Sequence, residues 1–349
     1  MILTIVGVGL IGGSLGLAAR RSGEFTVRGV SPRAQLALEA GLIDEAYDEL
    51  AEAVDGADVV VVAVPAGMVE EKLAEVLAAA PEGCAVTDVG STKGGVVAAA
   101  GGDERFVGGH PLAGAEVSGF EHARDGLFEE ATWYLTPTGE TSGVALERVH
   151  RLVTMAGARP TILAPDEHDR MMAAVSHLPH VFANLLVSQA SLALGDRTIP
   201  IAGPSFRDAT RVAGAAPGLW ASIYDDNAEA LGAAVGEAIA RLEEVRAALG
   251  SGDRDWLLAW QETAAGDRRR LIEEGLDGGP VREIPVAVPN RPGVVAEIAI
   301  ALGNADIDIT DMALSPAPDR RSGVISLWVP EEQAEAAERC LAGIDLASR

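Results

Sequence analysis

Three of the six histidines of the chain lie close together in the stretch EHDRMMAAVSHLPHVFANLL, residues 167–186. His177 and His180 are three residues apart on an apolar run with helical periodicity, so their rings would lie on the same side of a helix. Two imidazoles at this spacing could bind zinc or exchange protons. The sequence has no cysteine near them and no HExxH pattern, so we predict that this site holds no metal.

Two arginines, Arg207 and Arg211, lie in the segment FRDATRVA. A guanidinium forms two parallel hydrogen bonds with a carboxylate and keeps its charge at ordinary pH. The formal net charge is −25, from 27 basic and 52 acidic side chains, so an anionic substrate needs a locally basic pocket. The same charge disfavours nucleic acids and anionic membranes as partners. From the residues alone, either Arg207 or Arg211 could bind a carboxylate of the substrate.

A glycine pattern typical of dinucleotide binding opens the chain. Gly7, Gly9 and Gly12 form GxGxxG directly after the apolar run ILTIV and before a helical segment. These glycines allow a tight turn, a close approach to pyrophosphate and close packing of helix on strand, and the helix N-terminus binds the phosphates. We therefore predict that they bind NAD or NADP.

The end of the second expected strand, RGVSPRA, bears on the choice of cofactor. NAD-binding proteins usually carry an acidic residue there for the ribose 2′-hydroxyl. Here Ser31 lies near that position and Arg33 follows two residues later, so repulsion of a 2′-phosphate is absent and both side chains could bind one. We predict NADP, or use of both cofactors; Arg33 as a solvated helix start is the alternative.

The elements that must position these residues divide the chain into three domains. Apolar strand-like runs alternate with helical segments over 1–163 and predict an α/β class with a Rossmann-like, doubly wound sheet. Helical periodicity dominates 164–275, which we expect to be an all-helical domain. A glycine-rich linker, 276–282, precedes a small α+β domain at 283–349, with the order strand–helix–strand–strand–helix.

Cysteine usage and the N-terminus indicate the compartment. Cys84 and Cys340 lie far apart, which predicts no disulfide framework and a cytoplasmic protein. The apolar N-terminus approaches the length of a membrane span, but its charges follow the run and glycines interrupt it. We predict a strand and a turn there, not a signal peptide.

Four motifs occur in order along the chain: DVGSTKG (88–94), GGHPLAG (108–114), SHLPH (176–180) and FRDATRVA (206–213). Together they resemble the prephenate/arogenate dehydrogenase family of tyrosine biosynthesis, over nearly the whole chain. The segment VPNRPGVVAEI similarly resembles an ACT domain, the amino-acid-sensing module often attached to such enzymes.

The resemblance implies an NAD(P)-dependent oxidative decarboxylation of prephenate to 4-hydroxyphenylpyruvate. A hydride leaves the ring carbinol carbon for the nicotinamide while the ring carboxylate departs as carbon dioxide. Arogenate, with an amino group in place of the keto group, is the alternative substrate, and no residue decides between the two.

The resemblance also assigns the catalytic residues. It implies that His110 is the base that removes the hydroxyl proton, a role that a neutral imidazole suits. Ser91 matches the serine that hydrogen-bonds this catalytic group, and we also place it at the cofactor. His180 matches the histidine that contacts the substrate, on a turn where Pro179 kinks the helix.

Further positions match substrate-binding residues of the family. Arg211, rather than Arg207, aligns with the arginine that binds a substrate carboxylate. His177 has a supporting place near the substrate or is a buried core histidine. Glu116 and Asp169 match acidic positions near the active-site entrance, with ordinary solvated charges as the alternative.

In the C-terminal domain, the resemblance implies an amino-acid site at Asn290, Gly293, Asn304 and Ile307, with tyrosine as the effector. A purely structural dimerisation module is the alternative. Because ACT domains pair and the helices of 164–275 are apolar, we predict a homodimer.

Two other classes of protein share some of these features. A β-hydroxyacid dehydrogenase or an imine reductase has the glycine pattern and a helical second domain, but would use a lysine there, and residues 166–200 contain none. A redox-sensing regulator that binds NAD(P) and an amino acid does not need Ser91, His110, His180 and Arg211 together.

Overall fold

The computed structural model spans residues 1–349 and describes all of them except 115–118, 196–203, 276–280, 290–293, 318–321 and 345–349. The chain forms two compact units, Met1–Leu186 with Val212–Ala238, and Val187–Arg211 with Ile239–Arg349. These units divide the predicted helical domain, because its first helices pack on the N-terminal domain.

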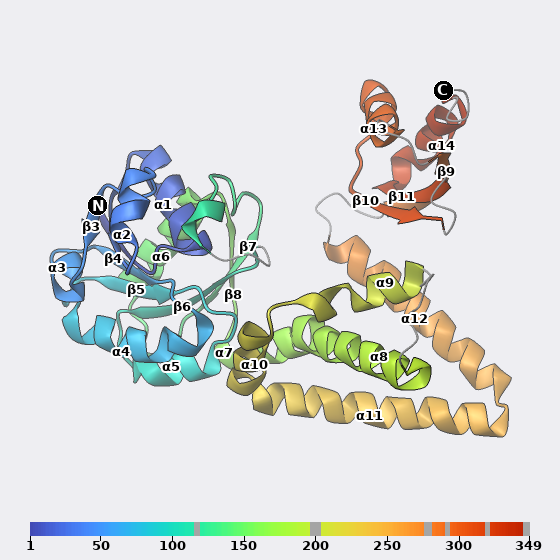
Figure 1. The fold of residues 1–349 in the computed structure, drawn as a ribbon, viewed down its shortest axis with the longest axis horizontal. Coiled ribbons are helices and arrows are strands. Elements are labelled where there is room, and N and C mark those ends of the chain that lie inside the picture. Colours follow the sequence, from blue (N-terminus) through green and yellow to red (C-terminus); the bar gives the residue numbers. More distant parts are fainter. Residues whose placement is uncertain (115–118, 196–203, 276–280, 290–293, 318–321, 345–349) are drawn as a thin grey trace. The chain divides into compact units, whose positions relative to one another are not determined.

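An eight-stranded sheet forms the centre of the first unit (Figure 1). Its strands are β1 (Ile2–Val6), β2 (Thr26–Val30), β3 (Glu45–Tyr47), β4 (Val59–Val62), β5 (Ala85–Asp88), β6 (Phe106–Pro111), β7 (Thr132–Thr136) and β8 (Arg159–Ile162). The order is β3-β2-β1-β4-β5-β6-β7-β8. Strands β1 to β6 are parallel, and β7 runs antiparallel to β6. The predicted doubly wound sheet is confirmed, and β3 and β8 are short strands that were not predicted.

Apolar residues cover both faces of this sheet. In β4, Val59 and Val61 belong to one core while Val60 and Val62 belong to the other, because successive strand residues point to opposite faces. The first core includes α1 (Leu10–Ser22), α2 (Ala34–Glu39) and α6 (Gly143–Met155). The second includes α3 (Leu50–Val54), α4 (Val69–Ala79) and α5 (Gly94–Ala100). Figure 1 shows these two helical layers on either side of the sheet.

The parallel strands bring the predicted site residues to one edge. Because β1, β4, β5 and β6 are parallel, their carboxyl ends lie along the same edge of the sheet, where ligands bind in open α/β folds. Gly7 follows β1, Asp88 ends β5, and His110 is the second-last residue of β6.

A continuous helix, Pro165–Leu194, carries the three clustered histidines. It consists of α7 (Pro165–Met172), a π-helical turn η3 (Ala173–His177) and α8 (Leu178–Leu194). The helix does not end at Pro179; the π-helical turn lies directly before it, where the proline leaves a carbonyl without its usual donor. By length and composition this helix could cross a membrane, a property that apolar helices of soluble proteins share.

The remaining helices of the predicted helical domain are α9 (Pro204–Thr210), the 3-10 turn η4 (Arg211–Gly214), α10 (Pro217–Asp226), α11 (Ala228–Ser251) and α12 (Arg254–Gly275). Helix α7 packs on α5 and β7, and α10 packs on η1 (Ala66–Met68). The start of the helical region therefore belongs to the same compact unit as the sheet.

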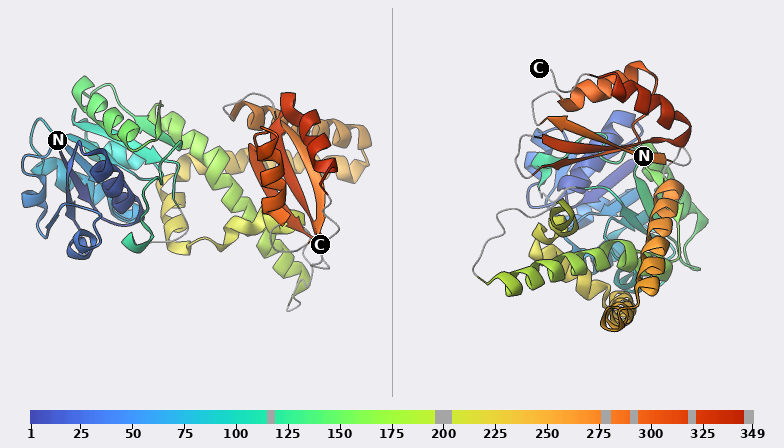
Figure 2. Two further views of the ribbon diagram at one scale, coloured as in Figure 1. Left: turned by 90° about the horizontal axis from the view of Figure 1, so that it is seen from above. Right: turned by 90° about the vertical axis from the view of Figure 1, so that its right-hand side faces the viewer.

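The C-terminal domain has the predicted strand–helix–strand–strand–helix order. Its elements are β9 (Val281–Pro289), α13 (Val294–Asn304), β10 (Asp311–Pro316), β11 (Ser322–Pro330), a 3-10 turn η5 (Glu331–Gln333) and α14 (Ala334–Ala342). The antiparallel order is β10-β11-β9, and Figure 2 shows both helices on one face of this sheet. Strand β9 begins at Val281, inside the predicted linker.

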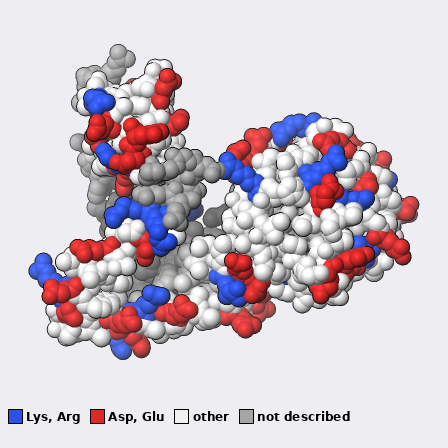
Figure 3. Space-filling model, turned by 180° about the vertical axis from the view of Figure 1, so that it is seen from behind, with Lys and Arg blue, Asp and Glu red and all other residues white. Residues whose placement is uncertain are grey.

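Acidic side chains are spread over the face that Figure 3 shows, and Lys and Arg side chains lie among them. Among the described residues, many Lys and Arg side chains are paired with carboxylates, such as Arg20 with Asp44 and Arg151 with Glu24. An anion can therefore bind only where a basic side chain or a helix N-terminus is locally available. Cys84 and Cys340 are both free thiols.

Candidate active site

A groove of about 790 Å³ lies along the carboxyl edge of the sheet in the first unit, and Gly7 and Gly9 line it. Gly7 has φ +101°, and a Cβ atom there would collide with the carbonyl of Ala63. A Cβ atom at Gly12 would collide with the carbonyl of Gly7. At Gly9 a Cβ atom would meet nothing within 4 Å, so the backbone faces open space. The fold itself thus requires Gly7 and Gly12, whereas Gly9 leaves room for a ligand.

The groove fits a dinucleotide at the start of α1. Gly9 caps this helix, and among the described residues no side chain accepts a hydrogen bond from its first N–H groups. These donors, together with the positive end of the helix dipole, could hold a pyrophosphate. The predicted role of Gly7, Gly9 and Gly12 is therefore consistent with the space around them.

Ser31 and Arg33 also line this groove, at the end of β2. The Arg33 guanidinium lies 4.3 Å from the centre of the Phe120 ring and is ion-paired with Glu121. The Ser31 hydroxyl accepts a hydrogen bond from the Arg33 backbone N–H at 3.3 Å. Arg33 is thus in the predicted place, but its charge is engaged by a carboxylate.

A chain of three side chains connects β6 to α7. His110 is 8% exposed, and its Nδ1 lies 2.9 Å from Nε2 of His168. Nδ1 of His168 lies 2.8 Å from Oδ1 of Asp169. The Asp169 carboxylate also accepts the backbone N–H groups of Lys93, at 2.8 Å, and Gly94, at 2.7 Å. The imidazole of His110 is therefore held from its Nδ1 side.

Burial and nearby charges set the protonation of this chain. Burial lowers the pKa of His110 well below its usual value, and the positive charge of Lys93 and the rings of His168 and His177 lower it further. Burial raises the pKa of Asp169, but hydrogen bonds from His168 and from the backbone of Gly94 and Lys93 outweigh it, and the pKa is lowered. At neutral pH His110 is a neutral imidazole and Asp169 is a carboxylate.

Beside His110 lies a fully buried ion pair between Lys93 and Asp88. The Lys93 ammonium also donates to the carbonyl of Gly109 at 2.8 Å, and the Gly109 N–H donates to Asp88 at 3.0 Å. Both charged residues belong to the motif DVGSTKG, whose pattern left their roles open. They join the end of β5 to the strand that carries His110.

His177 and His180 both contact the indole ring of Trp220 on α10, so they lie on the same side of the helix, as their spacing predicts. The His180 ring stacks on the indole at 3.3 Å between centres, and His177 meets it edge-on at 6.1 Å. His177 is 1% exposed, and its Nδ1 accepts a hydrogen bond from Asn227 Nδ2 at 3.1 Å. His180 is only half-buried. These surroundings match a core histidine at 177 and a more accessible one at 180.

The other predicted site residues of the first unit have different surroundings. Ser91 is half-buried beside Glu70 and Asp226, and its predicted hydrogen bond to His110 is not among those made by the described residues. Asp169 is 7% exposed, with its carboxylate engaged as described above. Glu116 lies outside the described residues.

In the second unit, Arg211 opens the turn η4 and is exposed, as is Arg207 on α9. Asn304 is the exposed last residue of α13, whereas the Ile307 side chain is buried in the core of the C-terminal domain. Asn290 and Gly293 lie outside the described residues.

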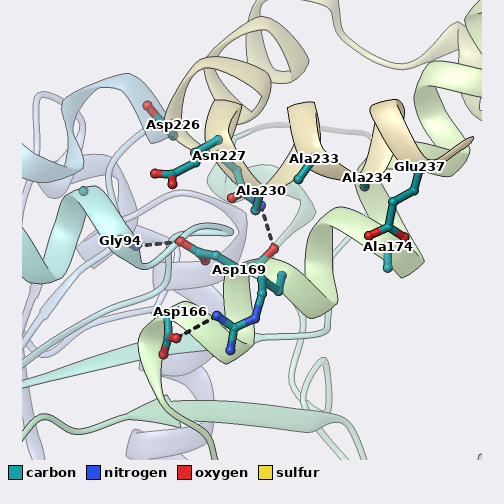
Figure 4. A pocket seen from close by; sticks show the side chains of 13 residues that line it. Gly94, Asp166, Asp169, Ala174, Asp226, Asn227, Ala230, Ala233, Ala234 and Glu237 are labelled. Atoms are coloured by element: carbon teal, nitrogen blue, oxygen red, sulfur yellow. Dashed lines mark hydrogen bonds and ion pairs between the residues drawn. The ribbon is translucent and has the colours of Figure 1, made fainter. Parts of the chain in front are cut away.

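A second cavity in the first unit, of about 620 Å³, is lined in part by Asp169 (Figure 4). Asp166, Asp226, Glu229 and Glu237 line it, with Arg170 paired to Asp166 at 2.8 Å. Burial and nearby carboxylates raise the pKa of Asp226. Within the described part of the chain, no three His, Cys, Asp or Glu side chains are grouped as a metal site requires.

Several residues around His110, His177 and His180 were not predicted from the sequence. No role was predicted for His168, which bridges His110 and Asp169, although its position next to Asp169 is visible in the sequence. Tyr134 on β7 lies 5.5 Å from His168 between ring centres. Trp220 on α10 and Asn227, directly after that helix, lie 40 and 50 residues after the histidines that they contact. No local pattern marks these three, because only the packing of distant elements brings them to the site.

Comparison with known proteins gives consistent results. Residues 15–163 match the model of the prephenate dehydrogenase nucleotide-binding domain, and residues 164–263 match that of the prephenate dehydrogenase dimerization domain. The chain is 32% identical to a prephenate dehydrogenase of Bacillus subtilis (strain 168), over 97% of this chain and 95% of the relative.

Two solved structures are similar to this one. Prephenate dehydrogenase from A. aeolicus, in complex with hydroxyphenyl propionate and NAD+, is 31% identical with a TM-score of 0.70, over 78% of this chain and 98% of that chain. Synechocystis arogenate dehydrogenase is 27% identical with a TM-score of 0.69, over 78% of this chain and 100% of that chain.

Proposed function

We infer that this chain, which belongs to the prephenate dehydrogenase family, is an NAD(P)-dependent oxidoreductase that converts prephenate to 4-hydroxyphenylpyruvate and carbon dioxide. The observation that carries this proposal is the placement of a neutral, buried imidazole, His110, at the same sheet edge as the glycine groove. Arogenate is the second candidate substrate, supported by the similarity to the Synechocystis enzyme.

The proposed reaction needs a base for the ring hydroxyl. His110 takes this proton on Nε2, because its Nδ1 is occupied by His168. Lys93 and Asp88 hold the end of β5 against β6 and so fix the position of the His110 backbone. Ser91, on the loop after β5, is proposed to reach the reacting hydroxyl or the cofactor. The bound nicotinamide supplies the hydride acceptor.

The two carboxylates of the substrate need separate partners. We assign Arg211 to the side-chain carboxylate, because a guanidinium offers a bidentate fork and keeps its charge. His180, stacked on Trp220, is assigned to a direct substrate contact. His177 supports the helix that carries His180 from the core, through its hydrogen bond with Asn227. Asp169, being engaged with His168, acts in this proposal through that histidine and not at the entrance.

For the cofactor, we propose use of both NAD and NADP. The end of β2 has no carboxylate to repel a 2′-phosphate, and Ser31 and Arg33 line the groove there. Against exclusive use of NADP, Glu121 engages Arg33, and Asp48 and Glu49 also line the groove. Michaelis constants that favour NAD strongly would reject this assignment.

The direct test is to mix the protein with prephenate and each oxidised cofactor and to follow the absorbance of the reduced nicotinamide. His110→Asn should lower kcat by about 100-fold or more while cofactor binding is unchanged. Arg211→Ala should raise the KM for prephenate far more than the KM for the cofactor. Turnover of arogenate but not prephenate would select the second candidate substrate.

The assembly and regulation follow from the family and the C-terminal domain. We propose a cytoplasmic homodimer, since the helical region matches a dimerization domain. We also propose that the C-terminal domain binds tyrosine, with Asn290, Gly293, Asn304 and Ile307 as the candidate positions. Because the Ile307 side chain is buried, it would contribute through its backbone. Calorimetry that detects no binding of tyrosine, phenylalanine or tryptophan would contradict this.

A further inference from the structure

The hydrogen bonds from Asp169 to His110 determine which ring nitrogens carry protons. A carboxylate can only accept, so Nδ1 of His168, 2.8 Å from Asp169, carries a proton and donates it. In a neutral His168 the other nitrogen, Nε2, then has a lone pair and accepts. Nδ1 of His110, 2.9 Å from that atom, must therefore be the donor.

His168 lies among buried polar and charged groups. His168 is fully buried, and the groups that face this pair of rings are Lys93 and Asp88 from β5 and the following loop, Asp169 from α7, His177 from η3 and Tyr134 from β7. The Lys93 ammonium already contributes one buried positive charge, and a second one on the His110 ring would be desolvated and repelled. The ionised Asp169 holds Nδ1 of His168 as a hydrogen-bond donor.

We propose that His168, held by Asp169, is a positioning residue that keeps His110 in the tautomer whose Nε2 accepts the hydroxyl proton of the substrate. This rests on the proposed function. In the other tautomer Nε2 would carry a hydrogen and could not act as a base. The catalytic role of His110 thus depends on a histidine one layer further from the cleft.

The step balances in protons and electrons. The hydroxyl proton moves to Nε2 of His110, the carbinol hydride moves to the nicotinamide, and the electrons of the broken bond to the ring carboxylate enter the ring as carbon dioxide leaves. The imidazolium formed on His110 keeps its Nδ1–H bond to His168. The carboxylate of Asp169 stabilises that charge through the polarised His168 ring.

The position of the ring protons can be measured without any substrate. Protein labelled with ¹⁵N in its histidines gives ring-nitrogen shifts that distinguish the two tautomers. His110→Asn, His168→Asn and, as an exposed control on α6, His150→Asn assign the signals. We expect both His110 and His168 to carry their proton on Nδ1. A proton on Nε2 of His110 in the free protein would overturn the proposal.

Two substitutions of His168 separate its two hydrogen bonds. His168→Asn places an amide at the position of Nδ1 and can still donate to Asp169, but it removes the acceptor for His110. His168→Gln places an amide oxygen near the position of Nε2 and can still accept from His110. We expect kcat to fall about 10- to 100-fold in His168→Asn, with KM values little changed, and to recover largely in His168→Gln.

The outcomes are distinct. An unchanged kcat in a folded His168→Asn, or a rise in KM with kcat unchanged, would contradict the positioning role. If His168→Asn does not fold, the tautomer in the wild-type protein still decides the question. A wild-type protein with the expected tautomer that does not turn over prephenate would refute the proposed function and leave the tautomer assignment standing.

Discussion

The three histidines of residues 167–186 have three different surroundings, although their spacing is that of one helix. His168 is fully buried between a histidine and a carboxylate, His177 is buried against an amide, and His180 stacks on an indole. The same side-chain type therefore serves as a positioning group, a core residue and a candidate substrate contact. The difference comes from the neighbours that other elements supply.

His177 should make folding sensitive to acid. Burial lowers its pKa from 6.5 to about 4. Because the unfolded state binds the proton more tightly, the contribution of neutral His177 to stability is complete above about pH 6.5 and is lost as the pH falls toward 4. His177→Asn, whose amide could still bond to Asn227, should lose less stability between about pH 7 and pH 4.5 than the wild type, measured by urea unfolding.

The control for this prediction is His150→Asn, which removes an exposed histidine on α6 and should leave the pH dependence as in the wild type. Parallel curves for the wild type and His177→Asn would show that His177 does not titrate in this window.

Glu121 should weaken the use of NADP. Its carboxylate occupies the guanidinium of Arg33, which is the candidate partner of a 2′-phosphate. Glu121→Gln should therefore tighten NADP+ binding about twofold to fivefold and leave NAD+ binding unchanged, as measured by fluorescence titration. Glu52→Gln, an exposed change on α3 outside the groove, is the matched control. An equal gain for both cofactors would argue against competition for Arg33.

At the scale of elements, buried polar groups join strands and helices around the site. The Lys93–Asp88 pair connects β5 to β6, and the Asp169 carboxylate on α7 accepts the N–H groups at the start of α5. Helix α5 therefore receives its N-terminal cap from a residue more than 70 positions later in the chain. These buried hydrogen bonds and ion pairs join the site residues to the sheet and its helices, so the site is held by the core of the fold.

Breaking the Lys93–Asp88 pair should destabilise the first unit. Both side chains are fully buried, so Lys93→Met leaves an unpaired carboxylate and should lower the free energy of unfolding by about 3–5 kcal/mol. Lys72→Met removes a lysine that pairs with Glu75 on the surface of α4, and should change the free energy of unfolding by less than about 1 kcal/mol. In a double-mutant cycle measured by urea unfolding, Asp88→Asn should lower the free energy of unfolding much less in the Lys93→Met variant than in the wild type.

At the scale of the whole molecule, the helical region exposes apolar side chains on α11. Ile239 and Leu242 are 54% and 50% exposed in the single chain. Exposed apolar side chains that gather on one element mark interaction surfaces in soluble proteins. This agrees with the match of this region to a dimerization domain.

A dimer should therefore sediment at twice the mass of the 36.0 kDa chain. Replacing Ile239 and Leu242 together by Glu should shift the protein to the monomer in sedimentation velocity, because two charges would be buried in the interface. Leu36→Glu, at a similarly exposed leucine on α2, should leave the dimer intact. A stable dimer in the double variant would exclude this part of α11 from the interface.

The sequence by itself determined the architecture and the family. Continuous apolar runs that alternate with helical segments predicted the sheet, the glycine spacing predicted the turn after β1, and GGHPLAG with SHLPH indicated the family. These signals are local: apolar runs, the spacing of the glycines and the repeat of a helix are read from residues that are close together in the chain.

Only the tertiary structure decided which side chains contact one another at the site. Its contacts join residues that are 50 or more positions apart in the chain. They are the hydrogen bonds of His110 to His168, of Asp169 to α5 and of His177 to Asn227, and the ion pair of Arg33 with Glu121. A side chain's partner and its protonation depend on burial and on charges from other elements. No spacing along the chain contains that information, so these contacts became visible only when the elements were packed together.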